Sequence, residues 1–504
     1  MQERRSDRRE RHPKSALAGP DGTPVTVIHV AAEYYPFARS GGLAEAVANL
    51  ARHQSRSGIR SVAILPLYRS ARDKAGELVQ VGEPFEVPLG KRRETVRLMT
   101  QRTPAPDARI YFIEHDGFYD RPKLYGDARG DFPDNPLRFG LFALASVMAI
   151  PMITDGPVLL HAHDWHAALA LTFLRTRFAA DERYRRVVTV LSVHNAGYQG
   201  HYPPSVMAEL GLPSHLFNYH QLEWYGKLNL LKGGLVFADA VITVSPNHAI
   251  ELRTAEGGFG LQEVFASLGD RFSGILNGID VEAWDPSTDD QIAARYSIDD
   301  PSGKAACKVQ LQERFGLRRD PRKPIFSMAA RLVTQKGLDL VVATYGLFEL
   351  DAQFVFIGAG EARFEEALAR IAGFMPDRVA LDTDFNDELE HQVMAGADFL
   401  LMPCQYEPCG LTQMRAQRYG VAPIVRRVGG LADTVEDGVT GFVFDPYEAE
   451  PLVGAALRGL DTYYNPPEWA RMIRTAMERD FTWERSVAAY VVVYRDLVGR
   501  LMGE

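Results

Sequence analysis

The chain has 504 residues, of which 46% are hydrophobic and 24% charged, so it is long enough for two or three globular domains and is neither disordered nor fibrous. Its formal net charge of −9 argues against a general attraction to nucleic acid or to anionic membranes. The longest apolar run, residues 141–153, is shorter than a membrane span and contains Pro151, so no membrane-spanning helix is expected. Three cysteines make no disulfide framework, and a cytoplasmic location fits best.

The first twenty residues carry six basic and three acidic side chains and no apolar run. A secretory signal needs an apolar segment, so this composition predicts a disordered tail, which we place at residues 1–23. An anion-binding arm is the alternative.

From residue 25 to residue 245, short β-rich apolar runs alternate with longer amphipathic segments. The runs lack a strict alternation of apolar and polar residues, which is typical of parallel strands covered by helices on both faces. The pattern predicts a doubly wound α/β domain over residues 24–272. The predicted strands are 25–32, 61–66, 109–114, 157–164, 187–195 and 240–245.

The same alternation resumes after about residue 274 and predicts a second Rossmann-like domain over residues 273–484. We expect the last segment, 485–504, to form a helix that packs back on the first domain. Ligands bind at the carboxyl ends of parallel strands and between domains, so polar motifs that follow strands are the candidate site residues. The predicted strands are 324–330, 352–360, 378–383, 398–404, 422–428 and 441–444.

The first such motif is RSGGLAEA, residues 39–46. Gly41 and Gly42 leave backbone N–H groups open at a helix N-terminus, and Arg39 adds a cation, which suits a phosphate or diphosphate. A tight strand–helix turn without a ligand is the alternative. The motif is not the GxGxxG sequence typical of NAD binding.

The second motif, HAHDWH, ends the strand 157–164. His161 and His163 share one face of that strand but Asp164 does not, which argues against a metal site. We expect a sugar-contacting site, with a structural histidine cluster as the alternative. The next strand ends in a similar polar motif, VHNAGYQG, which contains His194 and Asn195.

The predicted second domain carries cations and a carboxylate after its strands. Arg331 and Lys336 lie at a strand–helix junction and are suited to neutralise a diphosphate leaving group; a solvated surface pair is the alternative. Glu407 lies in the loop CQYEPCGLTQ, where it could bind sugar hydroxyls. Cys404 and Cys409 have no second cysteine pair nearby, so a zinc site is not expected.

Taken in order along the chain, these motifs resemble those of bacterial glycogen synthases and plant starch synthases, which are retaining GT-B glycosyltransferases. The likeness covers roughly residues 25–500 and includes EYYPFARSGGLAE, HAHDWHAAL, VHNAGYQGHY, GILNGIDVEAWDP, RLVTQKGLDL and EPCGLTQ. It implies an α/β protein of two Rossmann-like doubly wound domains facing across a deep cleft. It also implies transfer of glucose from ADP-glucose to the non-reducing end of an α-1,4-glucan such as glycogen, with retention and with no metal or other cofactor.

The resemblance further implies roles for single residues. Arg331 and Lys336 would hold the donor diphosphate, Glu407 would contact the donor sugar and help the transition state, and His163 would contact the glucose. The residues expected to bind substrate are Arg39, Gly41, Gly42, Asp134, Asn195, Asn277, Gly410, Leu411 and Thr412.

The chain departs from the family pattern at Arg39, where Lys is usual, and at Glu45, where Asp is usual. Arginine and lysine are not interchangeable at a phosphate, so the donor pose is affected. Arg415 stands where related retaining transferases carry a second Glu, and Lys227 where Gln is more usual. Alternative functions are transfer from UDP-glucose or to another acceptor, and glucan binding without turnover; a homo-oligomer is left open.

Overall fold

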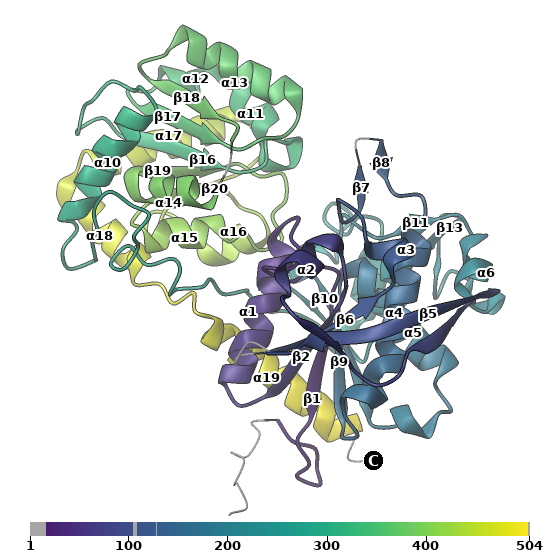
Figure 1. The fold of residues 1–504 in the computed structure, drawn as a ribbon. Coiled ribbons are helices and arrows are strands. Elements are labelled where there is room, and N and C mark those ends of the chain that lie inside the picture. Colours follow the sequence, from purple (N-terminus) through teal and green to yellow (C-terminus); the bar gives the residue numbers. More distant parts are fainter. Residues whose placement is uncertain (1–16, 104–107, 128, 385, 502–504) are drawn as a thin grey trace, which may run out of the picture. The chain divides into compact units, whose positions relative to one another are not determined.

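The computed structural model describes residues 17–103, 108–127, 129–384 and 386–501. The chain divides into two compact units, Met1–Val241 together with Val487–Glu504, and Ile242–Ser486. Each unit is an α/β domain built on its own sheet (Figure 1).

The first unit is built on a sheet that is parallel at its centre. Its strands are β1 (Thr26–Val30), β2 (Arg60–Pro66), β3 (Leu78–Gln80), β4 (Phe85–Leu89), β5 (Arg92–Gln101), β6 (Arg109–Glu114), β9 (Val158–His163), β10 (Val187–Val193) and β14 (Ala240–Thr243). They run in the order β14-β10-β9-β1-β2-β6-β5-β3, with β4 paired to β5 and with the short strand β15 (Phe272–Gly274) next to β14. β1 and β10 are buried along their whole length, as expected of strands covered on both faces.

The antiparallel strands β3, β4 and β5 are absent from the sequence prediction. In β5 exposed and buried residues alternate over part of its length, because one face of this edge of the sheet is solvated. A search for continuous apolar runs therefore passes over them. Five short strands form two small sheets away from the main one. β7 (Gly126–Asp127) pairs with β8 (Gly130–Asp131), and β13 (Lys227–Asn229) lies between β11 (His201–Tyr202) and β12 (Glu223–Trp224).

Helices and single turns connect these strands. They are α1 (Gly42–Arg56), α2 (Arg69–Lys74), α3 (Asp116–Tyr119), α4 (Asn135–Ile153), α5 (Asp164–Arg177), η1 (Glu182–Tyr184), α6 (Val206–Leu210), η2 (Ser214–Leu216) and α7 (Leu230–Phe237). Among the described residues, α4 alone is long and apolar enough to cross a membrane by length and composition. The helix begins before the apolar run seen in the sequence, and 78% of its most apolar window is buried inside the structure, as in the core helix of a globular domain.

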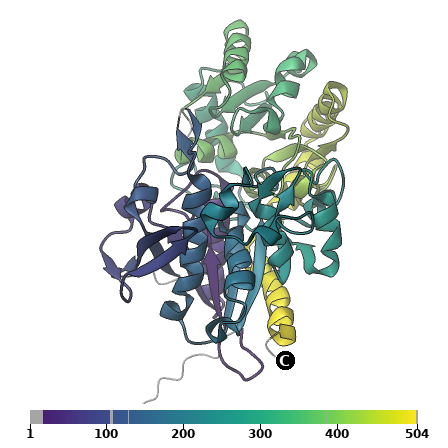
Figure 2. The same ribbon diagram turned by 90° about the vertical axis from the view of Figure 1, so that its right-hand side faces the viewer.

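The last helix, α19 (Trp483–Leu501), ends in the first unit. There Tyr494 is fully buried, and its hydroxyl lies 3.2 Å from Gln54 Nε2 of α1 and 2.7 Å from His161 Nδ1 of β9. Figures 1 and 2 show this helix in yellow. The end of the chain therefore belongs to the core of the domain with which the chain begins.

The second unit contains a parallel sheet of order β18-β17-β16-β19-β20-β21. The strands of this sheet are β16 (Ile325–Ala329), β17 (Gln353–Ile357), β18 (Val379–Asp382), β19 (Phe399–Met402), β20 (Ala422–Arg426) and β21 (Phe442–Phe444). Its helices are α8 (Pro246–Glu251), α9 (Gln262–Ser267), η3 (Gly269–Arg271), α10 (Ser302–Arg314), η4 (Thr334–Lys336), α11 (Leu338–Ala343), α12 (Tyr345–Glu349), α13 (Ala362–Phe374), α14 (Asp387–Gly396), α15 (Thr412–Arg418), α16 (Gly429–Thr434), α17 (Ala449–Tyr463) and α18 (Pro466–Met477).

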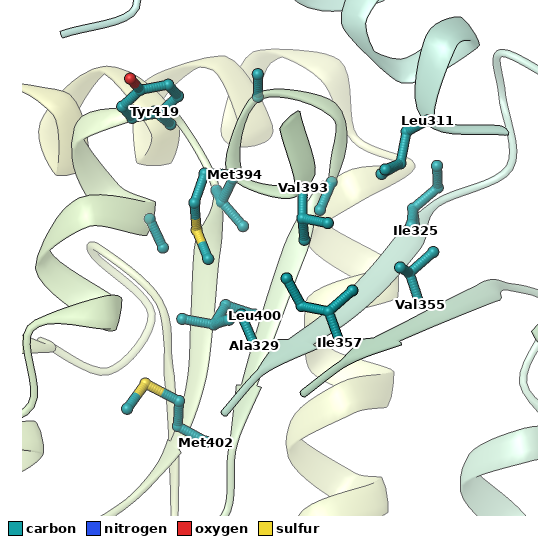
Figure 3. Close-up of a cluster of buried hydrophobic side chains, with 14 of the residues drawn as sticks. Leu311, Ile325, Ala329, Val355, Ile357, Val393, Met394, Leu400, Met402 and Tyr419 are labelled. Atoms are coloured by element: carbon teal, nitrogen blue, oxygen red, sulfur yellow. The ribbon is translucent and has the colours of Figure 1, made fainter. Parts of the chain in front are cut away.

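Two hydrophobic clusters enclose this second sheet. In one, Ile357 and Leu400 of the sheet pack with Leu311 of α10 and with Val393 and Met394 of α14 (Figure 3). Alternate residues of the same strands belong to the other cluster, which includes α11, α13 and α17. Helices thus cover both faces, which is the doubly wound arrangement predicted for this half of the chain.

The predicted disordered tail, residues 1–23, is only partly described, since residues 1–16 lie outside the described part of the chain. Residues 17–23 differ from the prediction because they form a turn in which Gly19 N donates to Thr23 O at 2.8 Å. Leu17 is fully buried, and its carbonyl oxygen accepts from Val25 N at 3.1 Å. One leucine among small and polar residues leaves no periodic pattern by which the sequence could show this.

We therefore expect deletion of residues 2–20 to lower the free energy of unfolding, by about 2–5 kcal/mol, the usual cost of removing a buried leucine side chain. Deletion of residues 2–16 keeps Leu17 and should leave stability near the wild-type value. Denaturant melts of the two truncated proteins measure the difference. Equal stabilities would show that Leu17 contributes no packing energy.

Candidate active site

In the second unit, an ion pair joins the loops that follow two neighbouring strands. Lys336 ends η4, shortly after β16, and Glu407 lies in the loop after β19; because the two strands pair, their carboxyl ends meet at one edge of the sheet. Lys336 Nζ and Glu407 Oε2 form the pair, with 19% and 9% of the side chains exposed. Cys404 Sγ lies 3.6 Å from the same carboxylate oxygen.

The charges of this pair stabilise one another. Burial by itself would lower the pKa of Lys336, but the adjacent Glu407 carboxylate outweighs burial and holds that pKa above its ordinary value. The ammonium is therefore present at neutral pH. Burial raises the pKa of the Cys404 thiol well above its usual range, so this sulfur stays protonated and is a poor nucleophile.

Several groups near these loops have donors or acceptors to offer a ligand. Arg331 is exposed, and its guanidinium has no hydrogen bond or ion pair within the described residues. The N–H groups of Leu411 and Thr412, at the start of α15, likewise donate to no acceptor in the described part of the chain, and Gly410 before them has φ +69°. Asn277 is buried, yet its side-chain amide makes no hydrogen bond to any described residue.

Gly429 and Gly430, the second GG pair in the sequence, lie directly beneath the Glu407 loop. A Cβ on Gly429, whose φ is +43°, would lie 1.9 Å from Glu407 O, and one on Gly430 would lie 2.1 Å from Cys409 O. Gly430 N donates to Glu407 O at 3.0 Å and Gly429 N donates to Glu251 Oε1 at 2.8 Å. These glycines allow close approach of two backbone segments, and their N–H groups face protein acceptors.

Replacing Gly430 with alanine should displace the Glu407 loop and cost about 1–3 kcal/mol of stability through overpacking. Gly454, in α17, is the matched control, because a Cβ there meets nothing within 4 Å and alanine should stabilise the helix. Thermal melts of Gly430→Ala and Gly454→Ala should therefore shift in opposite directions. A Gly430→Ala protein as stable as wild type would mean that the loop can move without cost.

In the first unit, a buried carboxylate holds the loop that contains Gly41 and Gly42. Glu33 accepts from Ser40 N at 2.6 Å, from Ser40 Oγ at 2.6 Å and from Tyr125 Oη at 2.7 Å, and more weakly from Gly41 N at 3.3 Å. One of the two predicted phosphate-facing N–H groups thus turns inward. Gly42 is exposed, and a Cβ there would meet nothing within 4 Å, so the N-terminus of α1 is open to a ligand.

Two other predicted residues of this unit have partners of opposite charge. Arg39 Nη2 lies 3.1 Å from Glu45 Oε1, so the two positions at which the chain departs from the family pattern are partners in one ion pair. Asp134 pairs with Arg121 through two bonds of 2.8 and 2.5 Å. Burial raises the pKa of Asp134, but Arg121 outweighs it and lowers that pKa overall. A substrate that uses Asp134 must therefore share it with Arg121.

The predicted sugar-contacting residue His163 is fully buried. Its Nε2 lies 3.0 Å from His29 Nδ1 and its Nδ1 lies 3.0 Å from His194 Nε2, so both ring nitrogens have protein partners. Its ring therefore offers no nitrogen to a sugar in this structure. His194, which is not among the predicted site residues, is partly exposed and lies at the surface end of the group.

His29, His161 and His163 are close enough to hold a metal ion, since one ring nitrogen from each lies within 4.8 Å of the others. Each of their six ring nitrogens already has a hydrogen-bond partner: His161 Nε2 is 2.7 Å from Ser192 Oγ, and the remaining five are bonded to the residues named above or to Gln54. A metal ion would have to replace several of these bonds. The donor set fits a hydrogen-bond network better than a metal centre.

Asp164, the first residue of α5, supports the loop that contains His194 and Asn195. Its Oδ1 accepts from His194 N at 2.7 Å and from Asn195 N at 3.4 Å, while Asn195 Oδ1 accepts from Gly197 N at 2.9 Å. Burial raises the pKa of Asp164 to about 7, and its φ of 56° is strained for a non-glycine residue.

Asp164, Glu33 and Arg121 are not among the site residues predicted from the sequence. Asp164 stands in HAHDWHAAL and Glu33 in EYYPFARSGGLAE, at or soon after the end of a predicted strand, and this position is the signal by which the sequence could have shown them. Nothing in the sequence marks Arg121 in this way, because only the folded chain brings its guanidinium next to the Asp134 carboxylate.

Comparison with known proteins agrees with this geometry. The starch synthase catalytic domain family matches residues 26–267, and the family of glycosyl transferases group 1 matches residues 309–478. A glycogen synthase of Syntrophotalea carbinolica is 39% identical over 481 residues, and one of Anaeromyxobacter sp. strain Fw109-5 is 41% identical over 480; each alignment covers 94% of this chain and 99% of the relative.

Two solved structures extend the comparison to the fold. The catalytic domain of starch synthase IV from Arabidopsis thaliana, bound to ADP and acarbose, is similar with a TM-score of 0.85 and 30% identity, covering 94% of this chain and 100% of that one. Sucrose-phosphate synthase from Thermosynechococcus elongatus is similar in fold alone, with a TM-score of 0.59, 18% identity and coverage of 94% and 99%.

Two Rossmann-like domains, with cations and a carboxylate at the strand ends of the second, define a glycosyltransferase of the GT-B class. The resemblance noted in the sequence is confirmed over nearly the whole chain. The chain belongs to the glycogen synthase family.

Proposed function

We propose that this protein transfers the glucosyl group of ADP-glucose to the non-reducing end of an α-1,4-glucan, with retention of configuration. The observation that carries the proposal is the Lys336–Glu407 pair beside the exposed Arg331, in a chain whose relatives match it over their full length as glycogen synthases. The ADP bound in the Arabidopsis starch synthase supports the choice of nucleotide. We expect the reaction to occur in the cytoplasm, where Cys307, Cys404 and Cys409 stay reduced.

The chemistry that these residues can supply is positioning and charge stabilisation. As the bond from the sugar to the diphosphate breaks, negative charge grows on the leaving oxygen, and Arg331 and Lys336 are the cations suited to stabilise it. The acceptor hydroxyl attacks on the same face and passes its proton toward the departing phosphate. Glu407, bonded to Lys336, orients that ammonium and is available to the sugar.

Further residues take part in this proposal through their unused groups. The N–H groups of Leu411 and Thr412 would face the phosphates, with Gly410 letting the chain turn toward them, and the amide of Asn277 would meet a sugar hydroxyl. The first unit offers further groups to the substrates. These are the cation of Arg39, the start of α1 at Gly41 and Gly42, the shared carboxylate of Asp134, the amide of Asn195, and the fixed ring of His163 behind His194.

The proposal is tested by ADP release from ADP-glucose with and without glycogen, with UDP-glucose as the comparison donor. A glycogen synthase releases ADP only with the glucan present and lengthens its chains. Faster turnover of UDP-glucose would assign a different donor. Binding of glycogen without release of either nucleotide would identify a glucan-binding protein that lacks turnover.

Removal of Arg39 should weaken use of the donor. Arg39→Ala loses a cation beside the open N-terminus of α1, and we expect the KM for ADP-glucose to rise about tenfold to hundredfold, the usual cost of one charged hydrogen bond. Glu45→Ala is the matched control, because it removes the carboxylate of this ion pair and keeps the cation. Steady-state kinetics with ADP-glucose varied give the comparison. Equal effects in the two variants would show that the pair acts on loop structure alone.

A further inference from the structure

Four side chains of the first unit form one line of hydrogen bonds. Gln54 Oε1, on α1, lies 2.9 Å from His29 Nε2 of β1. His29 Nδ1 lies 3.0 Å from His163 Nε2 at the end of β9. His163 Nδ1 in turn lies 3.0 Å from His194 Nε2, in the loop after β10. Gln54, His29 and His163 are fully buried, so the line runs from the domain core to the partly exposed ring of His194.

The rings of this line are neutral. Burial lowers the pKa of His29 to about 4 and that of His194 to about 3, and it lowers the pKa of His163 well below the ordinary value. A neutral imidazole has one N–H donor and one acceptor nitrogen. The direction of each hydrogen bond therefore determines the direction of the next one along the line.

The amide of Gln54 determines the direction of the whole line. Its oxygen faces His29 and also accepts from Ser61 Oγ at 3.1 Å, while its NH2 group donates to Tyr494 Oη at 3.2 Å. An amide oxygen can only accept, so His29 carries its proton on Nε2 and accepts at Nδ1.

The same rule fixes the remaining two rings. His163 donates from Nε2 to His29 and accepts at Nδ1, so His194 must donate from Nε2. His194 Nδ1 is then left as an acceptor, and it has no hydrogen-bond partner among the described residues. Because Asp164 also holds the backbone N–H of His194, both the ring and its main chain are anchored.

We propose that Gln54 is a positioning residue that acts through His29 and His163 to hold His194 as the Nε2-protonated tautomer, so that His194 Nδ1 accepts a hydrogen bond from a hydroxyl group of the sugar substrate. The identity of this ligand rests on the proposed function. With the opposite tautomer His194 Nδ1 would carry a proton and act as a donor, so the sugar hydroxyl would have to accept this hydrogen bond and could not donate to the ring.

A parallel branch supplies the matched control. His161 bonds through Nδ1 to Tyr494 Oη and through Nε2 to Ser192 Oγ, both at 2.7 Å. Ser192 is fully buried and lies on β10, so this branch ends inside the domain. Ser192→Ala removes one buried hydrogen bond to a histidine and leaves the line from Gln54 to His194 in place.

The tautomer is measured directly by NMR of protein labelled with ¹⁵N in its histidine rings, with signals assigned from single histidine variants. In the wild type we expect His194 protonated on Nε2, and in Gln54→Leu a mixture or the Nδ1-protonated form. An Nδ1-protonated His194 in the wild type, or an unchanged tautomer in Gln54→Leu, would overturn the proposal. A divalent metal ion bound to these rings in the purified protein would overturn it as well.

The kinetic test compares variants of equal melting temperature. Gln54→Leu should lower kcat/KM about tenfold to hundredfold, the usual effect of one misplaced hydrogen-bonding group, and Gln54→Glu, which keeps an acceptor oxygen, should recover most of the loss. Ser192→Ala should stay near the wild-type value. Equal losses in Ser192→Ala and Gln54→Leu would show a packing effect and overturn the proposal.

His194 itself is tested by two substitutions. Asparagine retains an acceptor near the position of Nδ1, whereas glutamine retains a donor near Nε2 but no acceptor at Nδ1. We therefore expect His194→Asn to keep more kcat/KM than His194→Gln, and the reverse order would contradict the proposal. If the wild type releases no ADP, the proposed function fails, while the tautomer measurement still tests the line.

Discussion

Arg331→Ala should lower turnover with ADP-glucose about 10²–10³-fold and leave the melting temperature unchanged. The loss is expected because the guanidinium would stabilise charge that develops on the departing diphosphate. Stability should be unaffected because Arg331 is exposed and its side chain has no partner among the described residues. The measurement is kcat at saturating donor and glucan, together with a thermal melt.

The matched control for this variant is Arg471→Ala on α18. Arg471 is also exposed, and its side chain also has no partner in the described part of the chain, but it lies within a helix and not at a strand end. Its removal should leave turnover within a factor of about two. Near-normal turnover of Arg331→Ala would remove Arg331 from the proposed mechanism.

Glu407→Gln should lower turnover by about 10²–10³-fold and should also lower stability. The location of Glu407 in a loop predicts a small structural cost, but its carboxylate is buried against the Lys336 ammonium. Removing one charge leaves the other buried without its full partner, at a cost of about 1–3 kcal/mol. Lys336→Met should lose turnover and stability for the same reason.

The double variant Lys336→Met, Glu407→Gln separates the two effects. Removing both charges relieves the unpaired ion, so we expect part of the stability to return while turnover stays low. The comparison requires melting curves and ADP release for the wild type, both single variants and the double variant. Additive losses of stability would show that the two charges do not interact, and recovered turnover would show that neither charge takes part in the reaction.

The sequence was sufficient to predict the two doubly wound domains and most of their parallel strands. Residues 187–193, for example, are mostly apolar and all buried because both faces of the strand are covered, and this pattern is local. The sequence also predicts the site residues of the second domain from their positions, because Arg331, Lys336 and Glu407 each come soon after a predicted strand. The ends of parallel strands meet at one edge of a sheet whatever the side chains are.

Tertiary structure decided which side chains meet. Lys336 and Glu407 are 71 residues apart and become partners because β16 and β19 are neighbours in the sheet. His163, which the sequence marks as a sugar contact, has both ring nitrogens bonded to other histidines, and His194 is the ring that reaches the surface. The hydrogen-bond partner of a side chain depends on the order of the strands in the sheet and on the path of each loop. The pattern of apolar residues along the chain carries no information about either.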